Sequence, residues 1–452
     1  MKITQIFSDT TFNKKLLSLA LPVTLQHLML ALVAAADALM LGKLNQDSMA
    51  AVSLATQIQF VQNMFIGAVV SGVGVLGAQY WGKKDTKVLG ELFGSSIREN
   101  LIISLLFFIG CRFYPEYLMK LFASDPILIK IGAEYLTIAS WSYLITGISQ
   151  AYLAVMRVTE HATYSAVISS TSVVINIILN AVFIFGLAYC PALGVKGAAL
   201  ATVITRIVEL LWCIIAGNGK NFVKLKIKTI FTINWTLTKD FWYYTTPLLG
   251  GYLIWGCGFT AYTAIIGHMG RDAAAANSIA AVVRDLVCCL CNGIAIGCGI
   301  IIGNQLGAGN LEKGKEYGSK ATILSIIVGG ISTIIILSSI PIMLQLVKLT
   351  PQAREYLIGM FIILSIYMIG RSICTVVING VFTSGGDTTF DVYSLIICMW
   401  GFALPCAFFG AFYFHLPVLV IYSCTCLDEV GKVPWVLYHY KKYKWVKNIT
   451  RD

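Results

Sequence analysis

One aspartate stands in the first long apolar stretch of the chain, at residues 31–42 (ALVAAADALMLG). An acid inside a membrane-length helix costs about 2.5–3.5 kcal/mol near its centre, so such a group normally has a function. The fifth apolar stretch carries Asn176 and Asn180, four residues apart and therefore on one helical face, and the sixth offers the hydroxyl of Thr202. Carboxylate, amide and hydroxyl oxygens suit a hard cation, and they can equally hydrogen-bond a proton on Asp37. The spacing predicts a cation or proton site at these four residues, with Na⁺ as one candidate and Asp37, Asn176 and Asn180 as its ligands.

The elements that must position these residues are long apolar helices. The chain has 452 residues, of which 57% are hydrophobic and 12% charged, against about 25% charged in soluble domains. Apolar stretches of about 20 residues follow one another along its length, which is typical of an all-α, multi-pass membrane protein. The predicted spans are 15–42, 50–78, 91–115, 131–156, 163–187, 194–217, 240–266, 276–303, 319–346, 354–379, 388–412 and 416–440.

The net charge of +11 is distributed unevenly between the two sides of the predicted membrane spans. Most of the 33 Lys and Arg fall on the side that both termini share, including the tail lysines at 441, 442, 444 and 447. Cytoplasmic loops carry such an excess, so both termini are expected in the cytoplasm. Anionic lipid headgroups are the partner this charge implies, and no nucleic acid is expected. The thirteen cysteines lie mostly in apolar helices without zinc-finger spacing, so no cofactor is expected.

The two halves of the chain repeat each other at an offset of 225 residues, the separation of Pro22 and Pro247. The same offset pairs Gly82 with Gly307, among several other glycines. Two copies of an even number of helices enter the membrane from the same side, so a pseudo-twofold axis along the membrane normal is expected, with substrate at the interface. The predicted parts are an N-terminal lobe (1–217), a cytoplasmic linker (218–239), a C-terminal lobe (240–440) and a basic cytoplasmic tail (441–452).

The repeat also tests whether the fold needs the first-helix acid. The offset carries Asp37 onto Tyr262, and residues 241–266 contain no Asp or Glu. The scaffold is duplicated while the acid is not, which favours a function specific to the N-terminal lobe.

Further polar and aromatic residues fall within the predicted spans. Arg206 with Glu209, and Arg284 with Asp285, are close enough in sequence to neutralise each other or to line a central cavity, and the spacing leaves both roles open. Pro22 and Pro247 are candidate helix hinges. The candidate residues of a substrate cavity are Gln26, Tyr143, Arg206, Tyr262, Arg284, Asp285, Tyr367 and Arg371.

Taken together, these segments resemble the MATE (multidrug and toxic compound extrusion) transporters, DinF-like branch, of the MOP flippase superfamily. The resemblance covers essentially the whole chain through the Pro22 helix, Asp37–Gly42, Gly77–Asp85, Asn176–Gly186, Gly194–Thr202, Gly303–Asn310 and Ser384–Thr388. It implies twelve helices in two six-helix lobes around a V-shaped cavity, and export of organic cations or other amphiphiles in exchange for H⁺ or Na⁺. In that branch the first-helix acid couples the ion, and the helix is thought to bend at its proline.

One departure from the family leaves the ion open. The fifth helix of that branch commonly carries an acid where this chain has Asn180, so the choice between H⁺ and Na⁺ is not decided. The expectation is a monomeric antiporter in the cell membrane. A flippase or exporter of a lipid-linked or anionic metabolite is the alternative, since Arg206, Arg284 and Arg371 would suit a phosphate. An integral-membrane enzyme is a remote alternative, because no hydrolytic motif lies at membrane depth.

Overall fold

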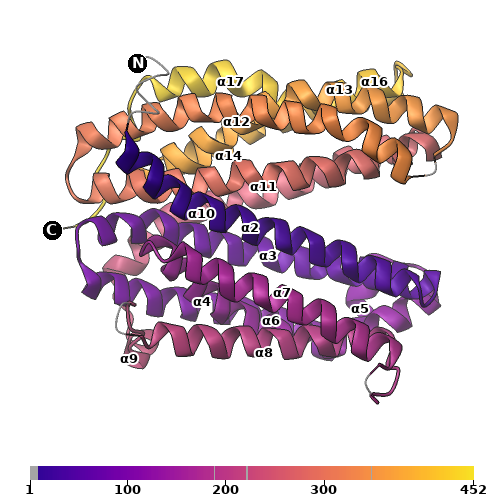
Figure 1. The fold of residues 1–452 in the computed structure, drawn as a ribbon, viewed down its shortest axis with the longest axis horizontal. Helices are drawn as coiled ribbons and strands as arrows, with labels where there is room; N and C mark the ends of the chain where they lie inside the picture. The colour runs from indigo at the N-terminus through magenta and orange to yellow at the C-terminus, as the bar shows by residue number, and fades with distance from the viewer. Residues whose placement is uncertain (1–8, 188, 220–221, 348, 452) are drawn as a thin grey trace. The chain divides into compact units, whose positions relative to one another are not determined.

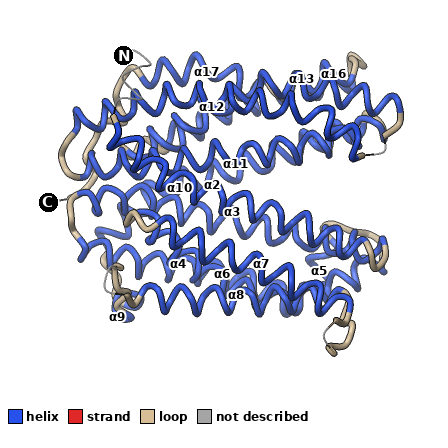
Figure 2. Tube along the Cα trace, viewed as in Figure 1, coloured by secondary structure: helices blue, strands red, loops and turns tan. Residues whose placement is uncertain are grey.

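The computed structural model describes residues 9–187, 189–219, 222–347 and 349–451. Within these ranges nearly every residue is helical and no strand occurs (Figures 1 and 2). In a bilayer each backbone N–H and C=O must find its partner inside the protein, and an α-helix satisfies them within its own segment. The all-α fold predicted from the apolar stretches is confirmed.

The helices of the first half are α2 (Thr10–Gly42), α3 (Gln46–Gly82), α4 (Thr86–Phe113), α5 (Pro115–Lys120), α6 (Pro126–Val158), α7 (Ala162–Phe185) and α8 (Val195–Gly217), and the linker contains the short helix α9 (Ile227–Phe231). Those of the second half are α10 (Trp235–His268), α11 (Arg271–Gly307), α12 (Leu311–Leu346), α13 (Pro351–Cys374), α14 (Thr389–Ser394), α15 (Leu404–Phe412), α16 (Val418–Thr425) and α17 (Leu427–Tyr440). Two π-helical segments, η1 (Thr375–Phe382) and η2 (Leu395–Ala403), continue α13 and α14.

Ten helical segments of the described chain are long and apolar enough to cross a membrane. The predicted count of twelve is not confirmed. The 33-residue α6, which corresponds to the predicted span 131–156, is not among the ten. The predicted span 416–440 is two shorter helices, α16 and α17, which meet at Cys426.

Polar residues in the connections set the ends of several helices. Asp85, Asp125 and Thr350 each accept a hydrogen bond from a backbone N–H in the first turn of the helix that follows. At the other end of α7, Gly186 adopts the left-handed conformation with φ of 73°, which only glycine enters without strain. Gly186 therefore marks the end of α7, the helix that carries Asn176 and Asn180.

The chain divides into two compact units. Unit 1 is Met1–Thr24, Ala78–Lys84 and Tyr243–Asp452, and unit 2 is Leu25–Gly77 and Asp85–Trp242. In unit 2, α6 packs against α4, α7 and α8, and in unit 1, α13 packs against α11, α12 and α17. Both α2 and α3 contribute residues to each unit. The lobe boundaries expected at 217 and 240 stay predictions.

The duplication is visible in unit 1, where the end of α3 meets the end of α11. A Cβ on Gly82 would lie 2.0 Å from the backbone oxygen of Asn304, and a Cβ on Gly307 would lie 1.9 Å from that of Gln79. The 225-residue offset maps Gly82 onto Gly307 and Gln79 onto Asn304, so each contact is the twofold image of the other. Only glycine allows the two backbones to come this close at both places.

Candidate functional site

Asp37, Asn176 and Asn180 form one hydrogen-bonded chain in unit 2. The Asn180 amide donates to a carboxylate oxygen of Asp37 at 2.5 Å and to the Asn176 side-chain oxygen at 3.1 Å. Asn180 is 1% exposed and Asn176 is 6% exposed, while Asp37 is half-buried. The structure thus brings three of the four predicted residues together, two from α7 and one from α2.

The i, i+4 spacing on α7 explains why both amides reach the same place. Residues four apart lie one above the other on a helix, so one asparagine can bridge its neighbour and a residue on α2. The Asn180 side-chain oxygen is buried without a hydrogen-bond partner in the described part of the chain. An unsatisfied buried acceptor costs about 1–3 kcal/mol, and a bound cation or an O–H group would remove that cost.

The fourth predicted residue, Thr202, makes none of these hydrogen bonds in the described part of the chain. Its hydroxyl donates to the backbone oxygen of Ala198 at 3.0 Å, one turn earlier on α8. Helical threonines commonly use this acceptor because it is the nearest available one.

The apolar core of unit 2 borders this site. It includes Leu41 from α2, Val52 from α3, Tyr143 from α6 and Ile184 from α7. Tyr143 is 1% exposed and belongs to this packed core. Gln26, on α2, is also buried, and its side-chain oxygen has no partner among the described residues.

The two predicted hinge prolines lie inside continuous helices. Pro22 is within α2 and Pro247 within α10. Proline removes one backbone hydrogen bond and weakens the helix locally. On α2 this weak point lies two residues before Thr24, where unit 1 gives way to unit 2.

The predicted arginines all have acidic partners. Arg206 contacts Glu209 at 2.7 Å, and Arg284 contacts its neighbour Asp285 at 2.9 Å. The guanidinium of Arg284 also lies 4.5 Å from the centre of the Phe259 ring. These pairs satisfy the charges within the protein, which leaves no unpaired guanidinium among these residues for an anionic cargo.

The remaining predicted residues belong to unit 1. Tyr262 is 7% exposed and packs with η2 residues Leu395 and Met399. Tyr367 is half-buried on α13, one turn before Arg371. Arg371 forms an ion pair with Glu429 of α17.

The sequence prediction missed the acidic and basic residues of α17. Glu429 pairs with Arg371 and, at 3.0 Å, with Lys432, and it is 1% exposed. Asp428 is also buried and accepts a hydrogen bond from the backbone N–H of Glu429 at 2.7 Å. The i, i+3 spacing of Glu429 and Lys432 within the predicted span 416–440 was the available signal.

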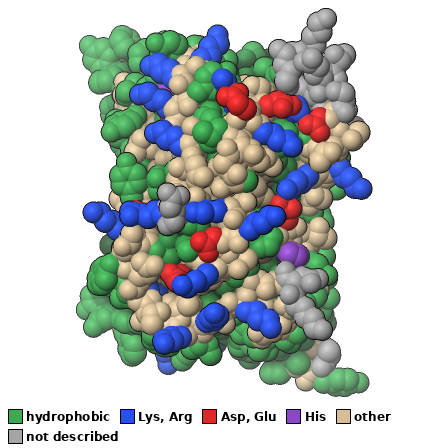
Figure 3. Space-filling model, turned by 90° about the vertical axis from the view of Figure 1, so that its left-hand side faces the viewer, with side chains coloured by type: hydrophobic (Ala, Val, Ile, Leu, Met, Phe, Trp, Pro, Cys, Tyr) green, Lys and Arg blue, Asp and Glu red, His purple; other side chains and the backbone are tan. Residues whose placement is uncertain are grey.

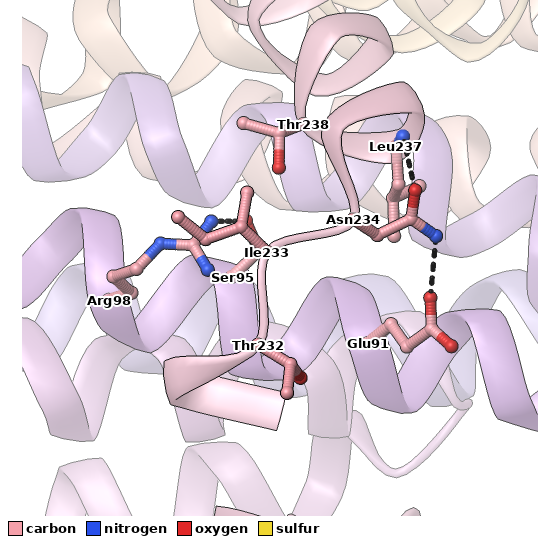
Figure 4. Close-up of a pocket in the computed structure, with 8 residues that line it drawn as sticks. All are labelled: Glu91, Ser95, Arg98, Thr232, Ile233, Asn234, Leu237 and Thr238. Atoms are coloured by element: carbon pink, nitrogen blue, oxygen red, sulfur yellow. Dashed lines mark hydrogen bonds between the residues drawn. The ribbon is translucent and has the colours of Figure 1, made fainter. Parts of the chain in front are cut away.

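A surface pocket lies elsewhere in unit 2, between α4 and the central linker (Figure 4). Arg98 donates to Ser95 at 2.9 Å, and Asn234 donates to Glu91 at 2.9 Å. The remaining lining residues are Thr232, Ile233, Leu237 and Thr238. The pocket contains none of the predicted site residues, and its polar groups hold the linker on α4.

Within the described residues, no three His, Cys, Asp or Glu side chains gather where they could hold a metal ion. A cation at Asp37 would therefore need amide oxygens as well as the single carboxylate. Na⁺ accepts such ligands, whereas transition metals prefer imidazole and thiolate.

Comparison with known proteins identifies the fold and the family. The MatE family model matches residues 22–182 and 247–409, so its two matches begin 225 residues apart, at the repeat offset. The relative described as an uncharacterized transporter, YisQ of Bacillus subtilis, is 24% identical over 425 residues, which cover 93% of this chain and 92% of that protein. The probable multidrug resistance protein NorM of Thermotoga maritima is 23% identical over 445 residues, covering 97% and 95%.

A solved structure has the same fold. The crystal structure of a single-residue mutant of the Vibrio cholerae MATE transporter VcmN superimposes with a TM-score of 0.88 at 17% identity, covering 97% of this chain and 98% of that one. MATE proteins are transporters of small molecules that need no cofactor and are not enzymes. The chain belongs to the MatE family of multi-pass membrane transporters.

Proposed function

We propose that this transporter is a secondary active antiporter that exports organic cations or other amphiphilic compounds in exchange for H⁺ or Na⁺. The observation that carries the proposal is the hydrogen-bonded chain from Asp37 through Asn180 to Asn176. It joins the single acid of the first helix to two buried amides. The second repeat has a tyrosine, Tyr262, at the position equivalent to this acid.

Either ion would act by changing what Asn180 does. While Asp37 is ionised, the Asn180 N–H group neutralises part of its charge. A proton on Asp37 would turn that oxygen into a donor, and rotation of the Asn180 amide would present its unpaired oxygen as the acceptor. The same rotation would give Na⁺ an amide oxygen beside the carboxylate. Ion binding and the arrangement of α2 against α7 are therefore coupled.

The driving force is adequate for transport. One charge crossing 100 mV supplies about 2.3 kcal/mol, and one pH unit adds about 1.4 kcal/mol if the ion is H⁺. Pro22 would let α2 bend when Asp37 is neutralised, so that the site faces the two sides of the membrane alternately.

The site of action is proposed to be the cell membrane, with both termini in the cytoplasm and the protein acting as a monomer. Figure 3 shows many basic side chains and fewer acidic ones. This excess of positive charge supports contact with anionic lipids on the cytoplasmic side. The multidrug resistance name of the NorM relative supports xenobiotic cargo.

The proposal is tested by uptake of a fluorescent organic cation into inverted vesicles, the direction that corresponds to export from the cell, with a pH gradient and a Na⁺ gradient imposed separately. Wild type is expected to respond to one or both, and Asp37→Asn to neither. Thr202→Val is the matched control, because among the described residues the Thr202 hydroxyl donates to Ala198 of its own helix. Equal ion-driven transport by wild type and Asp37→Asn would refute the coupling role.

A further inference from the structure

The last described residues, 441–451, form a strap that follows α17 and packs against several elements of unit 1. We propose that this C-terminal strap is a clasp that holds the end of α3 against the end of α11 and must release before that crossing can open. The inference rests on the proposed transport cycle, because a transporter made of two repeats opens to one side only when corresponding helices separate there.

The strap is fastened to α3 through the side chain of Gln79, which is fully buried. The Gln79 amide nitrogen donates to the backbone oxygen of Ser384 at 2.7 Å and to that of Lys447 at 3.1 Å. The backbone N–H of Ile449 donates to the Gln79 side-chain oxygen at 2.8 Å. One side chain of the first repeat thus bonds two strap residues and the turn after η1.

Trp445 anchors the strap to the second repeat. It is fully buried and stacks on Tyr440 with ring centres 5.7 Å apart. A Cβ on Gly318 would lie 2.3 Å from the Trp445 ring, and a Cβ on Gly385 would lie 1.5 Å from its backbone oxygen. The docking groove therefore depends on two positions that only glycine can occupy without displacing the strap.

Three further contacts join the strap to both helix ends. Lys83 of α3 donates to the backbone oxygen of Arg451 at 2.6 Å, and the Arg451 N–H donates to the Tyr80 hydroxyl at 3.4 Å. Asn448 donates to the backbone oxygen of Gly307, at the end of α11, at 3.4 Å. The strap therefore ties α3 and α11 at the place where their glycines bring the backbones together.

This crossing is where the two repeats touch symmetrically. Ala78 of α3 faces Gly303 of α11, where a Cβ would lie only 2.9 Å from the Ala78 methyl carbon. These two residues are related by the repeat offset, so the pseudo-twofold axis passes between them. Separating the helices would pull Gln79 from Lys447 and Ile449.

The test is hydrogen–deuterium exchange of the full chain in lipid nanodiscs, resolved by mass spectrometry. Gln79→Leu removes all three Gln79 bonds, and Ile449→Pro removes the backbone N–H that donates to the Gln79 side-chain oxygen while leaving Gln79 itself unchanged. Lys447→Ala is the matched control, because it removes a basic side chain and keeps the backbone oxygen that Gln79 binds. Both clasp variants are expected to exchange at least about tenfold faster than wild type over residues 444–451.

The deciding readout is the crossing itself. A clasp predicts that exchange also accelerates at residues 78–84 and 303–310 in both variants, and stays at the wild-type rate in Lys447→Ala. Acceleration confined to 444–451 would show a passive covering and overturn the proposal, as would acceleration in Lys447→Ala equal to that in Ile449→Pro. The measurement uses no substrate and no ion gradient. A failure of Asp37 coupling in vesicles is therefore distinguishable from a failure of the clasp.

Discussion

Replacing Glu429 by glutamine is expected to destabilise the protein strongly. Glu429 is buried at the start of α17, and its two carboxylate oxygens face Arg371 and Lys432, the latter at 3.0 Å. Lys432 is 4% exposed and Arg371 has a 19% exposed side chain. Glutamine keeps the size of the side chain but removes its charge. One of the two oxygens becomes an NH₂ group, so one of the two cations faces a hydrogen-bond donor in place of an acceptor.

The magnitude follows from the burial of the two cations. Removing one partner of a buried ion pair costs about 3–5 kcal/mol, because the remaining charge has lost both its partner and its water. Arg371 retains some access to solvent, whereas Lys432 has almost none. Asp428 lies beside Glu429 and offers Lys432 a second carboxylate nearby. Glu429→Gln is therefore expected to lower the free energy of unfolding by about 3 kcal/mol, the lower end of that range.

The assay is thermal unfolding of the purified protein in one detergent, followed by tryptophan fluorescence. Glu209→Gln is the matched control, since Glu209 is equally buried and pairs with a single arginine, Arg206, at 2.7 Å. Glu429→Gln should lower the midpoint further than the control, and adding Lys432→Met should recover part of the loss. A midpoint equal to wild type, or a double variant no more stable than Glu429→Gln, would refute the reasoning.

Three further predictions concern the helix crossing, the N-terminus and the ion site. Gly307→Ala should lower the free energy of unfolding by about 1–3 kcal/mol, because the added methyl group would lie 1.9 Å from a backbone oxygen of α3. In the control Gly330→Ala, the added methyl group meets nothing within 4 Å, so the melting temperature should not fall. The hydrogen bond from a buried lysine of α12 lowers the pKa of the Asp9 carboxyl, so the stabilisation from this ion pair is present above about pH 4, the ordinary pKa of aspartate, and is lost as the pH falls from there to the lowered pKa. Asp9→Asn should therefore lose about 1 kcal/mol of stability at pH 7, and the gap in melting temperature should close progressively below about pH 4. Asn180→Asp would place a second carboxylate beside Asp37, and the two charges would repel each other by about 4 kcal/mol at 4 Å. A bound Na⁺ would relieve this repulsion, so drug efflux should depend more strongly on Na⁺ than in wild type. An unchanged Na⁺ dependence would contradict the proposal that Asn180 belongs to the ion site.

The sequence predicted the helices and the repeat because both leave long, regular signals. Apolar length marks a membrane helix, and the offset between Pro22 and Pro247 is the offset between the two family matches. The i, i+4 spacing of Asn176 and Asn180 predicted a shared face, and the structure places Asp37 on that face. What the spacing could not supply was the direction of the hydrogen bonds, in which Asn180 donates and keeps its own oxygen free.

Features that depend on tertiary packing left weaker signals. Thr202 offered a hydroxyl, which in the structure donates to the backbone oxygen of Ala198 on its own helix. The charges of α17 lie in an apolar stretch, as Asp37 does, but their pairing leaves no signal in the sequence, because only folding brings Glu429 to Arg371 on α13. The tail was predicted from its lysines, whereas its docking depends on backbone groups of the strap and on the fully buried Trp445.

The coupling role of Asp37 is tested most directly by ion movement driven by cargo. Purified protein is reconstituted into sealed vesicles, an outward gradient of a transported organic cation is imposed, and H⁺ or Na⁺ entry is followed with a pH-sensitive dye or ²²Na⁺. Wild type is expected to move one of the two ions against the direction of the cargo, while Asp37→Asn exchanges cargo for cargo without moving either ion. Cargo-driven ion movement of equal size in Asp37→Asn would contradict the role assigned to Asp37.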